Sequence, residues 1–124
     1  MYWYLKVLKD FANFEGRARR KEYWMFTLFN ILILWALMSI FSVSLLIIKE
    51  YALLLIIPFF IYILIIFVPT IAVTVRRLHD INQSGLWYLI SFIPFGGYVL
   101  LVFTILDSTP GPNKYGPNPK EVCN

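Results

Sequence analysis

Three long runs without a charged side chain occupy most of the sequence. They cover residues 23–48, 51–75 and 81–106, and the third becomes continuously apolar only from Leu86. Each run exceeds the roughly 20 residues that a helix needs to cross a ~30 Å hydrocarbon core. None shows period-two alternation, and backbone amides in lipid must be satisfied within their own segment. The runs therefore predict transmembrane helices rather than barrel strands.

The polar segments between these runs set the expected organisation of a single membrane domain. The fold class is an all-α membrane protein with three transmembrane helices, an N-terminal interfacial amphipathic helix and an irregular C-terminal tail. The tail holds four of the seven prolines, which favour turns over helix. Within residues 1–124 the expected parts are a cytoplasmic interfacial segment (1–22), span 1 (23–48), span 2 (51–75), a cytoplasmic loop (76–85), a kinked span 3 (86–106) and the tail (107–124).

The third run contains helix breakers near its middle, at Pro94, Gly96 and Gly97. The flanking pieces, 86–93 and 98–106, would each be only about 13 Å long as helices. A kinked crossing is the preferred interpretation, because membrane helices tolerate proline. The alternative is a re-entrant hairpin that returns the tail to the cytoplasm, and its open turn needs protein or water around it.

The distribution of lysine and arginine predicts the orientation. The N-terminal segment carries six, the first loop one, the second loop two and the tail two. Because basic residues favour the cytoplasmic side, three spans place the N-terminus inside, with eight basic residues inside and three outside. The re-entrant alternative gives ten inside and one outside.

The composition agrees with a membrane location. Of the 124 residues, 60% are hydrophobic, 19% aromatic and only 15% charged, against roughly 25% charged in soluble domains. A small soluble domain has too little interior to bury so many apolar side chains. The net charge of +4 is mainly a topology signal, and nucleic-acid binding is disfavoured because the basic residues crowd the bases of the membrane helices.

The block RRLHD, residues 76–80, places charges where the second span ends. Arg76 and Asp80 are four residues apart in the less favourable base-first order, which leaves Asp80 free for another partner. We expect that partner to be an N-terminal arginine, because a planar guanidinium suits a carboxylate in a low-dielectric interface. The candidates are Arg17, Arg19 and Arg20. The alternative is a solvated loop that only sets topology.

The N-terminal block GRARRKEYW predicts local ion pairs if it is helical. Glu15 and Arg19 then form an i,i+4 pair, and Arg19 and Glu22 an i,i+3 pair. The remaining cations either fix the orientation or also bind anionic lipid headgroups, which attract each basic side chain by about 1 kcal/mol. The full candidate set for a charge network or headgroup site is Arg17, Arg19, Arg20, Arg76, Arg77, His79 and Asp80.

Within the spans the polar residues are uncharged. Asn30, Thr70 and Ser91 lie at similar depths in neighbouring spans, and they are candidates for one hydrogen-bonded intramembrane layer. Alternatively, each bonds to its own helix. The absence of Asp, Glu, Lys and Arg in the spans disfavours a proton relay or a voltage sensor.

The sequence offers no catalytic, cofactor or metal site. His79 is the only histidine and Cys123 the only cysteine, whereas metal sites usually take three or four protein ligands. No glycine-rich phosphate loop or dinucleotide fingerprint is present. The preferred function class is a non-enzymatic structural or interaction protein that contacts membrane lipids. The alternative is the protomer of an oligomeric small-solute transporter or channel, suggested by prolines and glycines within the spans. Under this alternative the protein assembles as a homo-oligomer.

Three blocks resemble signatures of a known family. They are NFEGRARRKEYW at residues 13–24, RRLHD at 76–80 followed by SGLW at 84–87, and NKYGPNP at 113–119. Their order and spacing resemble the small bacterial inner-membrane family known as domain of unknown function 805. The departures are Leu86, where a second Trp is frequent, and Lys114, where Arg is frequent. The resemblance implies a multi-pass plasma-membrane protein, and it assigns no activity.

Overall fold

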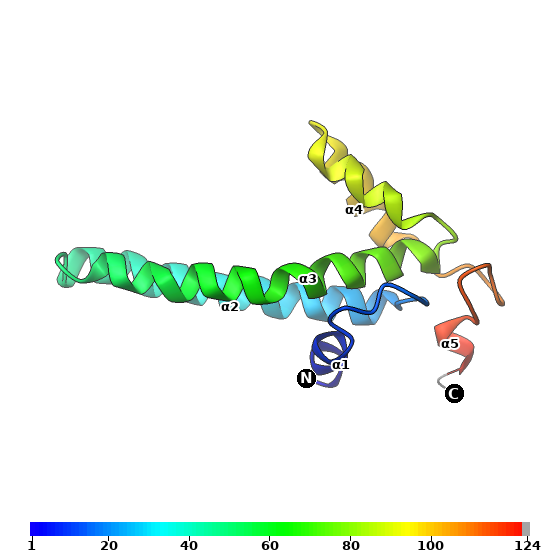
Figure 1. Ribbon diagram of the computed structural model, residues 1–124, viewed down its shortest axis with the longest axis horizontal. Helices are drawn as coiled ribbons and strands as arrows, with labels where there is room; N and C mark the ends of the chain where they lie inside the picture. The colour runs from blue at the N-terminus through cyan, green and yellow to red at the C-terminus, as the bar shows by residue number, and fades with distance from the viewer. Residues whose placement is uncertain (123–124) are drawn as a thin grey trace.

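The computed structural model describes residues 1–122, in which every regular element is helical. Two long helices, α2 (Arg20–Ile47) and α3 (Ile56–Asp80), run antiparallel along the long axis of the molecule (Figure 1). The 3₁₀ helix η1 (Ala52–Leu55) follows the turn between them. Both long segments are long and apolar enough to cross a membrane. The first two predicted spans thus correspond to these helices.

The surfaces of α2 and α3 explain why the chain needs an apolar solvent. Only 11% and 17% of the residues in their most apolar stretches are buried within the chain. The side chains of Leu46 and Leu64, for example, are 79% and 73% exposed. Aliphatic surface on this scale is unfavourable in water. A soluble core helix would be mostly buried, so these helices have the exposure pattern of membrane spans.

The helix α1 (Tyr2–Lys9) lies across the first turns of α2, and it is seen nearly end-on in Figure 1. The side chain of Val7 in α1 is fully buried in a small core with Ala18, Phe26 and Val73. The helix expected at the N-terminus therefore forms, and it is tied to both long helices by apolar packing.

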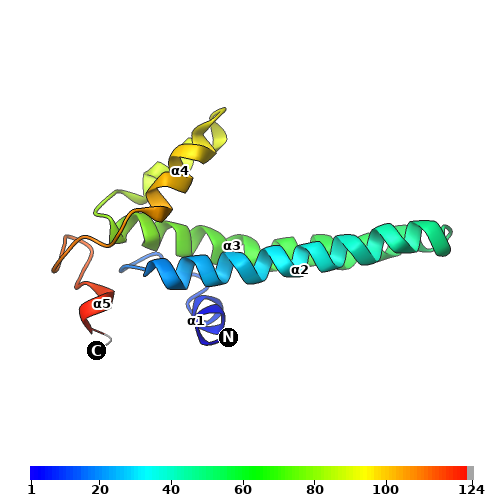
Figure 2. The ribbon, with the colours of Figure 1, turned by 180° about the vertical axis from the view of Figure 1, so that it is seen from behind.

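The third apolar run does not form one long helix. It contains the 3₁₀ helix η2 (Gly85–Phe92) and the helix α4 (Gly96–Ile105), which pack against each other as a hairpin that projects obliquely from α3 (Figures 1 and 2). Both ends of the hairpin lie near the C-terminal end of α3. Residues 86–106 therefore do not form the single kinked helix expected of span 3, and the segment turns back on itself as in the re-entrant alternative.

The reversal has a local cause at the tip of the hairpin. Pro94 has no backbone N–H to donate, and Phe95 adopts a left-handed backbone conformation with φ of 65°. Gly96 follows, and a Cβ atom placed on it would lie 1.6 Å from the carbonyl oxygen of Ile90. Only glycine allows the two arms to approach this closely.

The tail returns to α3 instead of leaving the far side of a third span. The backbone N–H of Thr109 donates to the carbonyl of Asp80 at 3.0 Å. An isolated bridge pairs Asn113 with Gly116, and the short helix α5 (Pro119–Val122) follows. The turns expected from the prolines form, but they are fixed by hydrogen bonds. Cys123 lies outside the described residues.

A buried ion-pair network at the end of α3

Charged side chains at the end of α3 are buried to an unusual degree. Arg76 is 3% exposed, and Arg77 and Asp80 are 0% exposed. Arg17 from the loop between α1 and α2 is 8% exposed. Buried charges are rarely tolerated without partners of opposite charge and hydrogen bonds. This cluster is accordingly the candidate functional site.

Asp80 is the anionic centre of the cluster. Its Oδ1 accepts a hydrogen bond from Nε of Arg17 at 3.0 Å. Its Oδ2 accepts from Nη1 of Arg77 and from the hydroxyl of Ser108. Its backbone carbonyl accepts from the N–H and the hydroxyl of Thr109. One residue therefore joins the N-terminal loop, α3 and the tail.

Arg17 uses all three of its nitrogens. Besides Nε, its Nη2 donates to the carbonyl of Asp80 at 3.1 Å and to that of Thr109 at 2.8 Å. Its Nη1 donates to the carbonyl of Gly111 at 2.9 Å and, more weakly, to that of Gly116 at 3.4 Å. These bonds use the fixed fork geometry of a guanidinium, which lysine lacks. Arg17 is thus saturated by the protein and leaves no donor for a lipid headgroup.

Arg77 fastens the outgoing arm of the hairpin. Its Nε donates to the carbonyl of Thr104 at 3.2 Å, and its Nη2 donates to the carbonyl of Leu106. Thr104 lies in the last turn of α4 and Leu106 is its C-cap, so no further helical N–H is available to these carbonyls. The indole of Trp24 in α2 also donates to Thr104 at 3.3 Å. The end of α4 is therefore held beside α2 and α3.

A second buried carboxylate, Glu22, holds α1 against the long helices. It is 0% exposed and accepts from Nζ of Lys6 and from Nη1 of Arg76, each at 2.9 Å. Asp10 adds a more distant charge, 3.8 Å from Arg76 Nη1. Nε and Nη2 of Arg76 are buried without a hydrogen-bond partner in the described chain. Glu22 is thus the counter-charge that joins α1, α2 and α3.

His79 contributes packing and one hydrogen bond. Its ring stacks on that of Tyr115, with 3.9 Å between centroids and 4° between planes. Its Nδ1 lies 3.1 Å from the carbonyl of Gly16, and in the tautomer with a proton on Nδ1 it donates there. Asn113 donates to the His79 carbonyl at 3.0 Å. Thus His79 also ties the tail to the N-terminal loop.

The structure separates the candidate charges into two groups. Arg17, Arg77 and Asp80 meet in one network, and Arg76 belongs to the neighbouring Glu22 cluster. Arg19 and Arg20 contact no carboxylate among the described residues. Arg19 instead lies 5.2 Å from the centroid of the Trp3 ring, a cation–π contact at the surface.

The local pairs expected in the N-terminal block do not form. Residues 11–19 are not helical, and Arg19 is the N-cap of α2. Glu15 is therefore not aligned with Arg19, and Glu22 points to Lys6 and Arg76 instead. Within α3, Asp80 pairs with Arg77, while Arg76 pairs with Glu22 of α2.

The expected polar layer is also different. The Asn30 side chain accepts from the hydroxyl of Tyr62 at 2.5 Å, and Tyr4 lies 3.2 Å from that hydroxyl. Thr70 donates to the carbonyl four residues before it in α3, and Ser91 to the carbonyl three residues before it in η2. Asn30 also donates to the carbonyl of Phe26 at 2.8 Å, so each of the three residues bonds to its own helix, as the alternative has it, and Asn30 in addition joins the tyrosines of α1 and α3.

Several members of these networks were missed by the sequence reasoning. Ser108, Thr109, Asn113 and Tyr115 lie in a tail that looked irregular, although the NKYGPNP block that contains two of them gave a signal. The buried role of Glu22 and the Tyr4–Tyr62 contact had no local signal. These contacts join residues far apart in the sequence, so no spacing rule indicates them.

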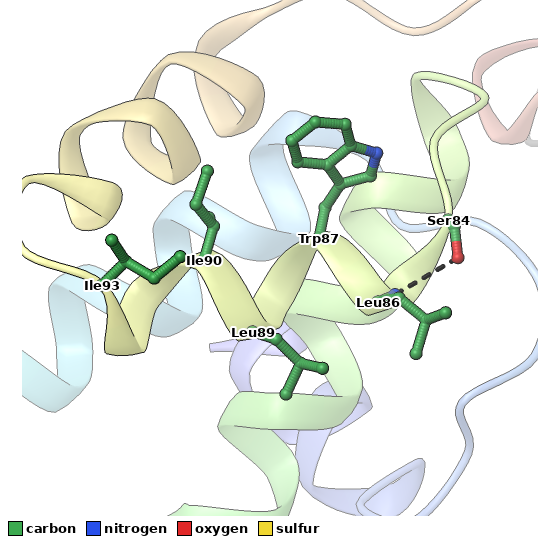
Figure 3. Close-up of a pocket in the computed structure, with 6 residues that line it drawn as sticks. All are labelled: Ser84, Leu86, Trp87, Leu89, Ile90 and Ile93. Carbon is green, nitrogen blue, oxygen red and sulfur yellow. Dashed lines mark hydrogen bonds between the residues drawn. The ribbon is translucent and has the colours of Figure 1, made fainter.

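An apolar hollow of about 520 Å³ lies along η2. Figure 3 shows Leu86 and Leu89 on one side of this helix and Trp87 and Ile90 on the other, with the Ser84 hydroxyl accepting from the N–H of Leu86 at 3.3 Å. The wall of this hollow is almost entirely hydrocarbon. In residues 1–122, no cluster of three side chains that could bind a metal ion occurs.

Comparisons with known proteins agree with a membrane location. The profile of a protein family of unknown function, DUF805, matches residues 11–117. The inner membrane protein YhaI of Escherichia coli strain K12 is 46% identical over 121 residues, which are 97% of this chain and 97% of YhaI. The inner membrane protein YhaH of the same strain is 45% identical over 135 aligned positions, covering 97% of this chain and 98% of YhaH. No solved structure gives a significant match.

Proposed function

This chain belongs to the DUF805 family, and from that premise we propose an inner-membrane protein with two full spans, α2 and α3. The hairpin of η2 and α4 enters the cytoplasmic leaflet and leaves it on the same side. The N-terminus, the ion-pair network and the tail are cytoplasmic, and residues 48–51 are periplasmic. The protein acts as a structural or interaction protein at the cytoplasmic face, where its surface cations contact anionic lipid headgroups.

The dimensions of the hairpin support a re-entrant segment. At about 2.0 Å per residue η2 is roughly 16 Å long, and at about 1.5 Å per residue α4 is roughly 15 Å long. Each arm is half of a ~30 Å hydrocarbon core. Exposed aromatic side chains surround the tip, with Phe92 at 78% and Phe95 at 81%. Such a surface is stable in lipid and costly in water.

The position of α1 supports an interfacial helix. It crosses α2 near Phe26, and the stretch from Phe26 to Ile47 is about 32 Å long at 1.5 Å per residue, close to the thickness of the hydrocarbon core. The exposed side of α1 carries Tyr2 and Leu5, at 68% and 47%, beside Lys9. This mixture suits the boundary between headgroups and acyl chains.

The return of the tail to α3 is the single observation that carries the orientation. With both ends of the hairpin on one side, ten of the eleven lysines and arginines lie on that side and only Lys49 on the other. The positive-inside rule then favours a cytoplasmic N-terminus far more strongly than three crossings would.

Cysteine labelling in intact cells tests this topology. In a Cys123→Ser background, Glu50→Cys should react with a membrane-impermeant maleimide from outside, whereas Lys114→Cys should react only after the inner membrane is opened. Lys9→Cys serves as a matched control for the N-terminal side and should behave like Lys114→Cys. Labelling of Lys114→Cys from outside in intact cells would contradict the re-entrant hairpin.

The cations available to lipid are those outside the buried networks. Arg20, Lys21 and Lys9 are exposed, and they make no ion pair among the described residues. Arg19 and Lys21 also lie within 6 Å of the Trp3 ring, at 5.2 and 5.9 Å from its centroid. A tryptophan with adjacent cations is typical of the headgroup region. The proposal therefore places lipid contact on this surface and not on Arg17 or Arg77.

Removal of two of these charges is expected to weaken anionic lipid binding. Because each basic side chain near the leaflet gains about 1 kcal/mol, an Arg20→Gln, Lys21→Gln protein should bind phosphatidylglycerol at least roughly tenfold more weakly. Lipid retention in mixed phosphatidylglycerol and phosphatidylcholine nanodiscs measures this. Lys49→Gln is the matched control, since its side chain is proposed to face the periplasm. Equal retention by both variants would refute the headgroup contact.

One observation favours a second candidate function. The third apolar run is interrupted at Pro94, Phe95 and Gly96, and if this segment lies in the bilayer it resembles the broken helices of many transporters. In this case the chain would be a protomer of an oligomeric carrier. Solute flux into proteoliposomes that contain the purified protein distinguishes this candidate from a purely structural role.

A further inference from the structure

The face of α2 that points away from α3 carries a regular stripe of exposed side chains. Its members recur at alternating spacings of four and three residues, which keeps them on one side of a helix and matches the repeat of packed helix pairs. In Figure 2, α2 lies in front of α3, and neither α1 nor α4 passes across its outer half. The stripe consists of Leu28, Leu32, Trp35, Ser39, Ser42 and Leu46.

Trp35 lies at an unusual depth for a tryptophan. It is 74% exposed, and along α2 it is about 14 Å from Phe26 and about 18 Å from Ile47. In the proposed membrane placement this is near the middle of the bilayer, whereas tryptophan prefers the interfaces. Its indole N–H has no acceptor among the described residues, and acyl chains supply none. A donor left unpaired in hydrocarbon is costly.

Acceptors lie one and two turns further along the same stripe. The hydroxyls of Ser39 and Ser42 donate to the carbonyls of Trp35 and Met38, at 2.8 Å each. Their oxygen lone pairs are therefore free to accept. Together with Trp35, Met38 and Val43 these serines line a hollow of about 460 Å³ on the surface of α2. The stripe thus presents a donor and acceptors that are not bonded to each other within the one helix.

We propose that this stripe is the interface of a parallel homodimer, in which α2 packs against α2 of a second copy. All copies of a chain insert with the same orientation, so a two-fold axis along the membrane normal brings the same stripes together. In a parallel pair with this spacing, a side chain packs into a hole on the partner helix that includes the residue four positions later. Trp35 of each copy then lies against Ser39 of the other.

A second copy satisfies the stripe better than lipid does. The dimer pairs each indole N–H with a serine oxygen, twice by symmetry, and small serines allow the close approach that membrane helices require. The aliphatic positions Leu28, Leu32 and Leu46 continue the contact at either end. The inference rests on the proposed span α2, but it requires neither the re-entrant hairpin nor the lipid contact.

Disulfide cross-linking in native membranes tests the interface. In a Cys123→Ser background, Leu32→Cys and Leu46→Cys should each form an oxidised dimer, because both lie on the stripe. Ile40→Cys is the matched control: it is 58% exposed on the same helix but lies about 120° away from the stripe. Leu64→Cys, on α3, is a second control. Both controls should remain monomeric.

The hydrogen bond is tested separately with Trp35→Phe, which keeps an aromatic ring and removes the N–H. At about 0.6 kcal/mol for each membrane hydrogen bond, the loss of two should weaken dimerisation about eightfold, as measured by fluorescence energy transfer in liposomes. An unchanged dimerisation constant would overturn the Trp35 contact. Equal cross-linking at Ile40, or no dimer at Leu32 and Leu46, would overturn the interface. The membrane placement is tested independently by the Glu50→Cys labelling. If Glu50→Cys is still labelled from outside although no dimer forms through the stripe, the proposed placement of α2 stands and only the dimer interface is wrong.

Discussion

Replacing Asp80 by asparagine is expected to lower the free energy of unfolding by about 3–5 kcal/mol, the usual cost of removing one partner of a buried ion pair. The carboxylate is 0% exposed, and it is the only anion in direct contact with Arg17 and Arg77 in the described chain. Asparagine keeps the size and one acceptor oxygen but leaves two buried guanidiniums without a counter-charge. Unfolding of the purified protein in mild detergent, titrated with dodecyl sulfate, measures the loss.

Asp107→Asn is the matched control for this change. Asp107 contacts Lys120 in the tail, but its side chain is 63% exposed, so the melting behaviour should stay close to that of the parent. Asp80→Arg should be worse than Asp80→Asn, because it adds a third buried cation. A compensating Arg17→Asp change should recover part of that loss, as a double-mutant cycle requires. An Asp80→Asn protein that melts like the parent would show that the network adds no stability.

The two long helices could be predicted from the sequence because a membrane span is encoded locally. An uncharged run of sufficient length is enough, and the expected 23–48 and 51–75 agree with α2 and with η1 plus α3 to within a few residues. The differences lie at the ends, where Arg20 and Asp80 extend the helices beyond the apolar runs. The charge of Asp80 is paired with Arg17 and Arg77, whereas Arg20 is exposed at the first turn of α2, so both charged ends are tolerated beyond the apolar runs.

The path of the third run could not be decided from its own residues. Pro94, Gly96 and Gly97 suit both a kinked helix and a turn. The choice is made by contacts outside the run. Arg77 binds the carbonyl of Leu106, and Asp80 binds Thr109, so the end of α4 is fixed beside the end of α3.

The ion pairs show the same division between local and distant information. The sequence indicated that Asp80 needs an N-terminal arginine, and Arg17 is 3.0 Å away. It did not select Arg17 over Arg19 or Arg20, because the intervening loop is irregular and no helical spacing applies. Glu22 was assigned to Arg19 because a helix was assumed through both residues, whereas Arg19 is the N-cap of α2 with an extended backbone.

Replacing Gly96 by alanine is expected to open the hairpin. The new Cβ would lie 1.6 Å from the carbonyl oxygen of Ile90, a backbone atom that no side-chain rotation can move away. Overpacking typically costs 1–3 kcal/mol where side chains relax, and here relief requires separating η2 from α4, so a loss of at least about 3 kcal/mol is expected. Detergent unfolding measures the loss of stability. The reactivity of an Ile90→Cys thiol in a Cys123→Ser background reports whether η2 has separated from α4.

Gly97→Ala separates this clash from a general effect of changing glycine. A Cβ at Gly97 meets nothing within 4 Å, and the residue lies in the first turn of α4, where alanine is favoured over glycine by up to about 1 kcal/mol. Gly97→Ala should therefore match or exceed the parent in stability, and the Ile90→Cys thiol should stay as reactive as before. If Gly96→Ala is as stable as Gly97→Ala, the added Cβ does not clash with the carbonyl of Ile90. The arms of the hairpin would then lie further apart than in the structure.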